Sequence, residues 1–273
     1  MGTGLGLRAI KVAAAAADRL RSPGAGVIVL IYHRVGARTA VQVDLPTDLF
    51  ERQMAVLAAS GRVITLDDAV DALIAGTAPD HVASPVVVTF DDGTADFVEE
   101  AVPVLVRHGI PATLYLATDF VERGCSFPDD GAPASWGSLG DALTTGLVSI
   151  GSHTHTHLLL DRADPGLAAS ELDRSIELIG ERLGVTARHF AYPKAVAGSA
   201  AAEAAVRARF RSAAVGGARP NRWGASDIYR LNRSAIQVAD GMRWYAHKIE
   251  GGMVLEEQLR AALNRRRHAG ATT

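Results

Sequence analysis

The stretch VVVTFDDG at residues 86–93 decides the fold class of this chain. Its first part, Val86–Phe90, is a short, largely apolar run of the kind that is buried on both faces of a parallel β-sheet. Its second part, Asp91-Asp92-Gly93, places two carboxylates directly after that strand. Because parallel α/β folds carry their chemistry beyond the carboxyl ends of the strands, this stretch predicts both a buried strand and a functional site.

The segments on either side of this stretch alternate between strand-like and helix-like patterns. Strands are predicted at Val27–Tyr32, Arg62–Thr65, Val86–Phe90, Ala112–Ala117, Leu147–Ile150, His189–Tyr192, Ser212–Val215 and Ile228–Val238. Helices are predicted at residues 5–21, Thr47–Ser60, Asp67–Ala75, Thr94–His108, Gly137–Thr145, Pro165–Leu183, Ala200–Phe210 and Leu255–Arg267. This alternation predicts parallel strands covered by helices, in either a (β/α) barrel or a doubly wound sheet.

Length and composition fit one α/β domain. The chain has 273 residues, of which 48% are hydrophobic, enough to bury a single large core. A formal net charge of −2 provides no basic surface for nucleic acid. The single cysteine, Cys125, excludes an internal disulfide.

The N-terminal region contains an apolar stretch that is too short for a secretory signal. Val12–Ala17 has six residues and is closed by Asp18, and nowhere does an apolar run reach the ~18 residues needed to span a membrane. Residues 5–21 are therefore predicted to form an alanine-rich helix that either caps the domain or lies at a membrane interface. We expect the protein to be cytoplasmic or peripheral to the membrane.

The adjacent carboxylates of Asp91 and Asp92 indicate a cation site. Two neighbouring carboxylates repel each other and usually need a cation or a proton to coexist. One of them can then ligate a metal while the other acts as a base. The alternative is a helix N-cap, since an aspartate at this position can accept hydrogen bonds from free backbone amides.

A second polar motif, GSHTHTH at residues 151–157, also follows a predicted strand. In an extended conformation all three imidazoles share one face, whereas in a helix only His153 and His157 align. Two imidazoles and a carboxylate are ligands that zinc and similar metals prefer, and they leave positions open for water and substrate. The alternative is a solvated loop that is rich in histidine by chance.

Together the two motifs resemble those of the polysaccharide deacetylase family, carbohydrate esterase family 4, which is also called the NodB homology domain. Its first motif, T-F-D-D-G, is matched at residues 89–93, and its second, H-[ST]-x-x-H, is matched at residues 153–157. The resemblance implies that Asp92, His153 and His157 bind the metal, that Asp91 is the general base, and that His155 occupies a variable position.

The resemblance covers roughly residues 26–240 and implies a single-domain, distorted (β/α)7-type barrel. Residues 1–25 are then an N-terminal helical segment, and residues 241–273 a C-terminal helical extension. The similarity also extends to Trp136, before the second motif, which is a candidate to stack on a sugar face or, equally, a core residue.

The third family motif, often similar to Arg-Pro-Pro-Tyr-Gly, is altered here. Ala191 stands where the arginine would be, and Lys194 where the tyrosine would be. The segment instead resembles a branch that includes poly-β-1,6-N-acetylglucosamine deacetylases and begins with a Tyr-His dipeptide, matched by Tyr32-His33. That branch supplies a late arginine, for which Arg233 is the candidate.

The activity implied by the resemblance is the removal of N-acetyl groups from a carbohydrate containing N-acetylglucosamine. A divalent metal, zinc by default with Co²⁺, Ni²⁺ or Mn²⁺ as alternatives, would activate water while Asp91 takes its proton. Arg233 is expected to pair with Asp91, and a backbone N–H near Tyr192 to contact the substrate. The late Leu-x-x-His motif of the family is missing, so His33 is the candidate acid.

Three other functions are consistent with some of these residues. The chain could be an O-acetyl carbohydrate esterase, or a catalytically impaired homologue that binds glycan, as the changes at Ala191 and Lys194 suggest. Two histidines and one carboxylate also occur in non-haem iron oxygenases, but these have a β-rich scaffold and need no second aspartate beside the ligand.

Overall fold

Seven parallel strands close into one barrel. The computed structural model describes residues 10–18, 24–79, 82 and 84–259. Within these residues the barrel order is β1-β4-β5-β6-β7-β8-β9, and β9 pairs with β1. The strands are β1 (Ile28–Tyr32), β4 (Val86–Phe90), β5 (Ala112–Leu116), β6 (Val148–Ser152), β7 (His189–Ala191), β8 (Ser212–Gly216) and β9 (Leu231–Ala235). The predicted (β/α)7-type barrel is confirmed, and a doubly wound sheet is excluded.

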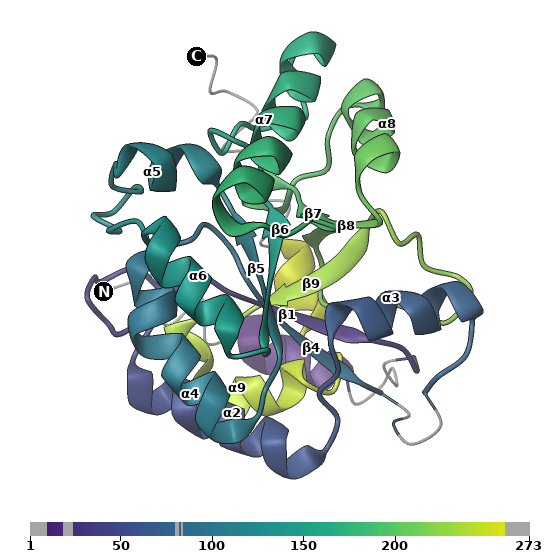
Figure 1. Cartoon of the computed structure of the whole chain (residues 1–273). Coiled ribbons are helices and arrows are strands. Elements are labelled where there is room, and N and C mark those ends of the chain that lie inside the picture. The colour runs from purple at the N-terminus through teal and green to yellow at the C-terminus, as the bar shows by residue number, and fades with distance from the viewer. Residues whose placement is uncertain (1–9, 19–23, 80–81, 83, 260–273) are drawn as a thin grey trace.

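Helices surround this barrel (Figure 1). They are α2 (Thr47–Ser60), α3 (Leu66–Ala75), α4 (Val102–His108), α5 (Thr118–Arg123), α6 (Trp136–Thr144), α7 (Pro165–Leu183), α8 (Ala200–Arg209) and α9 (Gly241–Lys248). Shorter elements are the π-helical turn η1 (Phe97–Ala101), the 3-10 turns η2 (Pro193–Ala195) and η3 (Val238–Asp240), and a two-stranded sheet of β2 (Arg34–Val35) and β3 (Asp44–Leu45). Helix α2 contacts both α4 and α9, and α7 contacts both α6 and α8.

Alternation along the strands creates two apolar layers. Leu30 and Val88 belong to the large outer core against the helices, whereas Val29, Val87 and Tyr115 belong to a smaller core that includes the barrel interior. Since side chains alternate along a strand, a residue two positions after an interior one also faces the interior. This period of two carries polar side chains into the carboxyl end of the barrel.

The predicted strand at Arg62–Thr65 is wrong. Val63 forms only an isolated bridge with Val86. Helix α3 begins immediately afterwards, because the Thr65 hydroxyl accepts a hydrogen bond from Asp68 N and caps the helix. Local capping therefore ends the extended segment before it can form a ladder.

The predicted strand at Ile228–Val238 is shorter in the structure. Asp227 forms a turn, in which its carboxylate accepts from Tyr229 N at 2.9 Å and its carbonyl accepts from Arg230 N at 2.9 Å. Strand β9 consequently begins at Leu231. Helices α5 and α9 and the β2–β3 sheet were not predicted as separate elements.

The two ends of the described chain meet on the barrel. Residues 10–18 and 254–259 are helical, and the rest of both predicted terminal helices lies outside the described residues. Lys11 is buried and pairs with Asp240 at 2.5 Å and with Glu256 at 2.6 Å. The division of the chain at residues 25 and 240 stays a prediction. None of the described helices combines the length and apolar character needed to cross a membrane.

A buried histidine lies at the amino end of the barrel. His189, the first residue of β7, has Nδ1 2.8 Å from Ser212 Oγ and Nε2 3.2 Å from Asp67 Oδ1. Arg211 pairs with the same carboxylate. Burial lowers the pKa of His189 to about 4, in spite of the neighbouring Asp67, so the imidazole is neutral at pH 7.

We expect the free energy of unfolding to fall as the pH drops from 6.5 to about 4. The unfolded chain takes up a proton at His189 near its usual pKa of 6.5, whereas the folded chain resists protonation until about pH 4. Over this window protonation favours the unfolded state, and the loss at pH 4 reaches about 3 kcal/mol from this group. Above pH 6.5 the histidine contributes no pH dependence.

Urea unfolding of wild type and His189→Gln between pH 8 and pH 4 measures this contribution. His189→Gln should lose the part of the pH dependence that His189 contributes, about 3 kcal/mol by pH 4, while His247→Gln, at a partly exposed position on α9, serves as the control. The same pH dependence in wild type and His189→Gln would contradict the assignment.

Candidate metal centre and active site

The acidic motif turns sharply at the end of β4. Asp92 and Gly93 have φ angles of 75° and 106°, in the left-handed region that favours glycine. A Cβ at Gly93 would lie 2.2 Å from Leu116 Cδ1, so the position requires glycine. The turn leaves Asp91 buried, at 3% exposure, and brings Asp92 to the wall of a cavity.

The histidine motif after β6 is neither extended nor helical. Thr154 and His157 both have left-handed φ angles, of 65° and 63°. His155 is directed toward α5, where its Nδ1 lies 2.9 Å from Thr118 Oγ1. Both conformations considered from the sequence are therefore wrong, yet the folded turn still brings His153 and His157 together and excludes His155.

Asp92, His153 and His157 form one cluster of candidate metal ligands, termed the ligand cluster. One ligand atom of each lies within 4.8 Å of those of the other two. Asp92 Oδ1 is 3.8 Å from His153 Nε2 and 3.5 Å from His157 Nε2. Two imidazole nitrogens and one carboxylate oxygen at this spacing fit a divalent cation with further positions open.

The protonation states of the two imidazoles suit ligation. His153 Nδ1 lies 2.7 Å from the carbonyl oxygen of Ala191, to which it donates, so that Nε2 presents its lone pair to the cluster. Burial lowers the pKa of His153. Burial, followed by the charge of His153, also lowers the pKa of His157 to about 4. Both rings are therefore neutral at pH 7, the form that binds metal.

Asp91 lies beside the ligand cluster, with its Oδ2 3.8 Å from His153 Nε2, and is paired with Arg233. Its two carboxylate oxygens accept hydrogen bonds from Arg233 Nη1 and Nη2 at 2.6 and 2.9 Å. The guanidinium is fully buried and lies 5.0 Å from the centre of the Tyr115 ring. Burial by itself would raise the pKa of Asp91, but Arg233 lowers it to about 2, so the carboxylate is ionised.

A buried glutamate that the sequence analysis missed supports the histidine turn. Glu171, on α7, is 6% exposed, and its carboxylate accepts hydrogen bonds from His155 N at 3.0 Å and Thr156 N at 2.8 Å. It also accepts from the Thr156 hydroxyl at 2.9 Å. The available signal was its helical phase, because Glu171 shares the buried face of α7 with Leu172 and Ser175.

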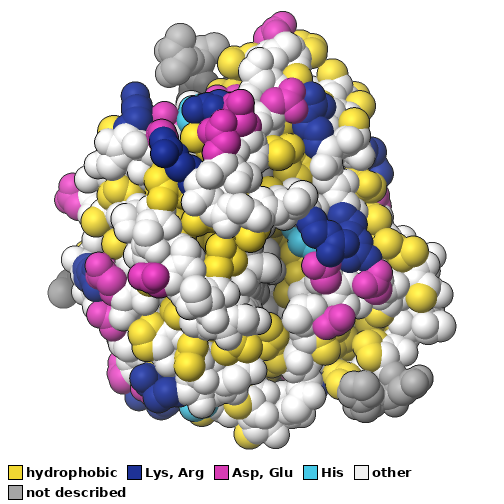
Figure 2. All heavy atoms as spheres, viewed as in Figure 1, with side chains coloured by type: hydrophobic (Ala, Val, Ile, Leu, Met, Phe, Trp, Pro, Cys, Tyr) yellow, Lys and Arg dark blue, Asp and Glu magenta, His cyan; other side chains and the backbone are white. Residues whose placement is uncertain are grey.

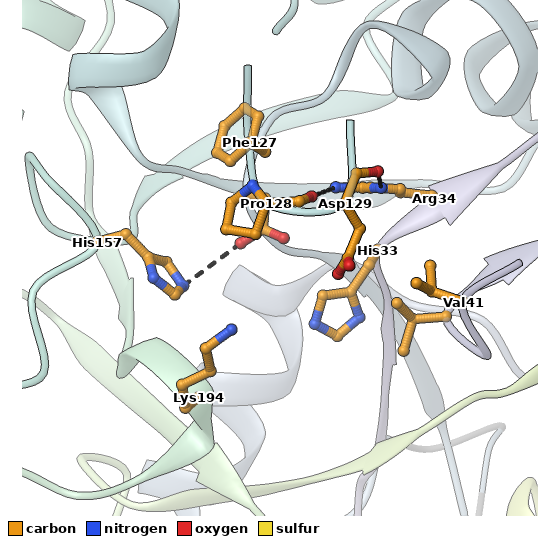
Figure 3. Close-up of a pocket in the computed structure, with 10 residues that line it drawn as sticks. His33, Arg34, Val41, Phe127, Pro128, Asp129, His157 and Lys194 are labelled. Carbon is orange, nitrogen blue, oxygen red and sulfur yellow. Dashed lines mark hydrogen bonds and ion pairs between the residues drawn. The ribbon is translucent and has the colours of Figure 1, made fainter. Parts of the chain in front are cut away.

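A cavity of about 190 Å³ adjoins the ligand cluster (Figure 3). Its lining residues are His33, Arg34, Val41, Val43, Asp92, Phe127, Pro128, Asp129, His157 and Lys194. Arg34 fixes one wall by donating to the carbonyl oxygens of Pro128 at 2.5 Å and Asp129 at 2.8 Å. The cavity thus combines apolar walls with charged groups, as sites for small polar ligands commonly do.

The structure brings His33 into this cavity. It follows β1, and its ring points into the cavity from the side opposite His157 (Figure 3). His33 Nδ1 is buried and has no hydrogen-bond partner among the described residues.

Trp136 does not line the cavity. It is the first residue of α6, and its Nε1 donates to Glu122 Oε2 at 2.8 Å. Its partly buried ring packs against the main hydrophobic core. The structure therefore places it as the core residue that the sequence analysis gave as the alternative to sugar stacking.

Tyr192 also lies outside the cavity lining, contrary to the prediction of a substrate contact. Its side chain is fully buried in the outer core, with its ring centroid 5.0 Å from that of Phe190. The reason is strand alternation, because Phe190 and Tyr192 are two residues apart and face the helices together. Its backbone N–H donates to Ala214 O at 3.0 Å and is not free for a substrate.

Comparison with known proteins identifies the class of this chain. Residues 79–213 match the family model for polysaccharide deacetylases. The chain belongs to the polysaccharide deacetylase family, whose members are hydrolases. The matched region contains both the acidic and the histidine motif.

Individual relatives agree with this family. The chain is 26% identical over 166 residues to YxkH of Bacillus subtilis, a match that covers 60% of this chain and 55% of YxkH. The structure of IcaB from Ammonifex degensii is similar with a TM-score of 0.72 and 25% identity, over 83% of this chain and 98% of IcaB. The Streptococcus pyogenes deacetylase PplD in complex with acetate has the same fold, with a TM-score of 0.68 and 23% identity over 79% of this chain and 94% of PplD.

The geometry of the histidine turn predicts unequal effects of its histidines on metal binding. His157→Ala should weaken zinc binding by more than about 100-fold, since the loss of even an outer-shell partner costs about 10- to 100-fold. His155→Ala should bind zinc almost as wild type does, because this ring faces Thr118. Zinc affinity is measured by competition with a chromogenic chelator, and a larger loss in His155→Ala than in His157→Ala would refute the ligand assignment.

Proposed function

We propose that this protein is a metal-dependent hydrolase that removes N-acetyl groups from a glycan containing N-acetylglucosamine. The observation that carries the proposal is an ionised carboxylate, Asp91, directly beside the ligand cluster but bonded to Arg233. Metal-assisted hydrolysis of an unactivated amide combines a cation that activates water with a separate base that takes the proton of that water. Membership of the polysaccharide deacetylase family supports an acetylated carbohydrate as the substrate class.

Zinc is the ion that we propose for the ligand cluster, with Co²⁺, Ni²⁺ and Mn²⁺ as alternatives. The donor set of two neutral imidazoles and one carboxylate supports this choice, because it matches catalytic zinc sites that retain an open position. When bound, the ion would polarise the acetyl carbonyl and lower the pKa of the attacking water. Asp92, His153 and His157 would hold it in place.

Asp91 accepts the proton from the attacking water as the water oxygen forms a bond to the acetyl carbon. Arg233 keeps Asp91 ionised and fixes its orientation through the two hydrogen bonds. The carbon–nitrogen bond then breaks, acetate leaves with the oxygen of water, and the nitrogen takes up a proton to leave as an amine. One amide and one water thus give one acetate and one protonated amine.

His33 is the proposed donor of that last proton. Its position on the cavity wall supports the role, because a donor must reach the departing nitrogen. Imidazole is suited to this step because a ring nitrogen can carry a proton and donate it. Among the residues that line the cavity, His33 is the histidine outside the ligand cluster.

Acetate release from β-1,6- and β-1,4-linked N-acetylglucosamine oligomers tests the proposed function. The zinc-loaded protein should release acetate, whereas Asp91→Asn should retain zinc and glycan but lose about 10²- to 10⁴-fold in kcat, the usual contribution of a general base. Loss of zinc from Asp91→Asn would instead assign Asp91 to the metal. Wild type that binds these glycans without releasing acetate would support the impaired homologue, and release from O-acetylated sugars alone would support the esterase.

His33→Ala should affect amides far more than activated esters. An amine needs a proton to leave, whereas the phenolate of an aryl acetate leaves without one. We expect a fall of about 100-fold or more in kcat on N-acetylated oligomers, and a much smaller fall on 4-nitrophenyl acetate. Equal losses on both substrates, with zinc content unchanged, would remove His33 from the acid role.

A further inference from the structure

Lys194 is a charged residue of the cavity to which the proposed function assigns no role. It lies in η2, directly after β7, with left-handed backbone angles of φ 54° and ψ 17°. This backbone conformation is strained for a residue other than glycine. Such a strained conformation persists where the surrounding fold or the function requires it. The turn directs the Lys194 ammonium into the cavity, between His157 and His33 (Figure 3).

The ammonium has no anionic partner within the described chain. Lys194 forms no hydrogen bond or ion pair with any residue that the structure describes, although Asp92 and Asp129 line the same cavity. The other cationic side chain of the lining, Arg34, is committed to two backbone carbonyls. Lys194 is therefore the cavity cation that is available to a ligand.

The position of Lys194 opposes a metal in the ligand cluster. Lys194 and His157 line the same cavity, and the ammonium points into the space beside the ligand cluster (Figure 3). A positive charge there repels a divalent ion bound by His157. An anion between the two cations offsets this repulsion.

Such an anion arises during the proposed reaction. The carbonyl oxygen of the acetyl group gains negative charge as water attacks, and the released acetate carries the charge afterwards. A backbone donor near Tyr192 was expected to contact the substrate, and the N–H of Tyr192 itself is bonded to Ala214 O. The ammonium of Lys194 supplies a positive charge in the same cavity.

We propose that Lys194 completes an anion subsite, which binds the acetyl oxygen as it becomes negative and then the carboxylate of acetate. The inference rests on the proposed function. Lys194 acts through its fixed charge and takes no part in proton transfer, which remains with Asp91 and His33. It is a catalytic residue in this assignment, because it contacts the reacting oxygen.

The subsite predicts opposite effects of one substitution on metal and on rate. Lys194→Met, which keeps the length and removes the charge, should bind zinc about 5-fold more tightly because a neighbouring cation is gone. Its kcat should fall by on the order of 100-fold, the typical loss when one donor to an oxyanion is removed, with KM little changed. Lys194→Arg should keep wild-type zinc affinity and most of kcat.

Acetate binding tests the subsite without turnover. Calorimetric titration of the zinc-loaded protein with acetate should show a Kd that is about 10-fold weaker for Lys194→Met, as expected for loss of one charge-assisted contact. Arg162→Gln, which removes an exposed positive charge in the segment after His157, is the matched control and should change none of these quantities.

The outcomes separate this inference from the proposed function. Unchanged zinc affinity, acetate affinity and kcat in Lys194→Met, with an active wild type, would overturn the subsite and leave the deacetylase proposal standing. A wild type that releases no acetate from any glycan, while Lys194→Met still binds acetate more weakly and zinc more tightly, would support the anion subsite and overturn the deacetylase proposal.

Discussion

The buried ion pair between Asp91 and Arg233 is the constraint on which the rest of the site depends. Adjacent carboxylates at a strand end repel each other. The fold relieves this repulsion by pairing the ionised carboxylate of Asp91 with Arg233 inside the barrel. Asp92 alone is then left for the ligand cluster. Because Arg233 is fully buried, removal of either partner would leave an uncompensated charge in the core, at a cost of about 3–5 kcal/mol.

The ion pair also explains how the altered third motif is accommodated. Ala191 stands on β7 where the family often has an arginine, and it belongs to the inner apolar layer together with Tyr115. Its small side chain leaves barrel volume for Arg233, which enters from β9 instead. The carbonyl of Ala191 meanwhile accepts the hydrogen bond from His153. Strand β9 thus positions the Asp91 carboxylate through Arg233, and β7 positions the His153 imidazole through the carbonyl of Ala191.

Backbone strain is concentrated around the cavity. Asp92, Thr154, His157 and Lys194 all adopt left-handed angles after the carboxyl ends of strands. Each such non-glycine residue costs about 1–2 kcal/mol, so the surroundings must hold it. At the histidine turn the hydrogen bonds to Glu171 hold the strained backbone in place. Glu171 therefore helps to position His157, although it lies away from the chemistry.

The sequence patterns determined a parallel α/β fold and the chemical character of its strand ends, while the barrel was implied by the resemblance to the family. Short strand-forming runs are followed directly by Asp91-Asp92-Gly93 and by the histidine motif. These are local signals, because the pattern of a buried strand and the polar residues at its end lie in consecutive positions. They could not show that neither Trp136 nor Tyr192 lines the cavity, or that Glu171 supports the turn. Those facts depend on strand phase and on contacts between residues far apart in the chain, as the 142 positions between Asp91 and Arg233 illustrate. Only the closure of β9 onto β1 brings Arg233 inside the barrel, where it pairs with Asp91.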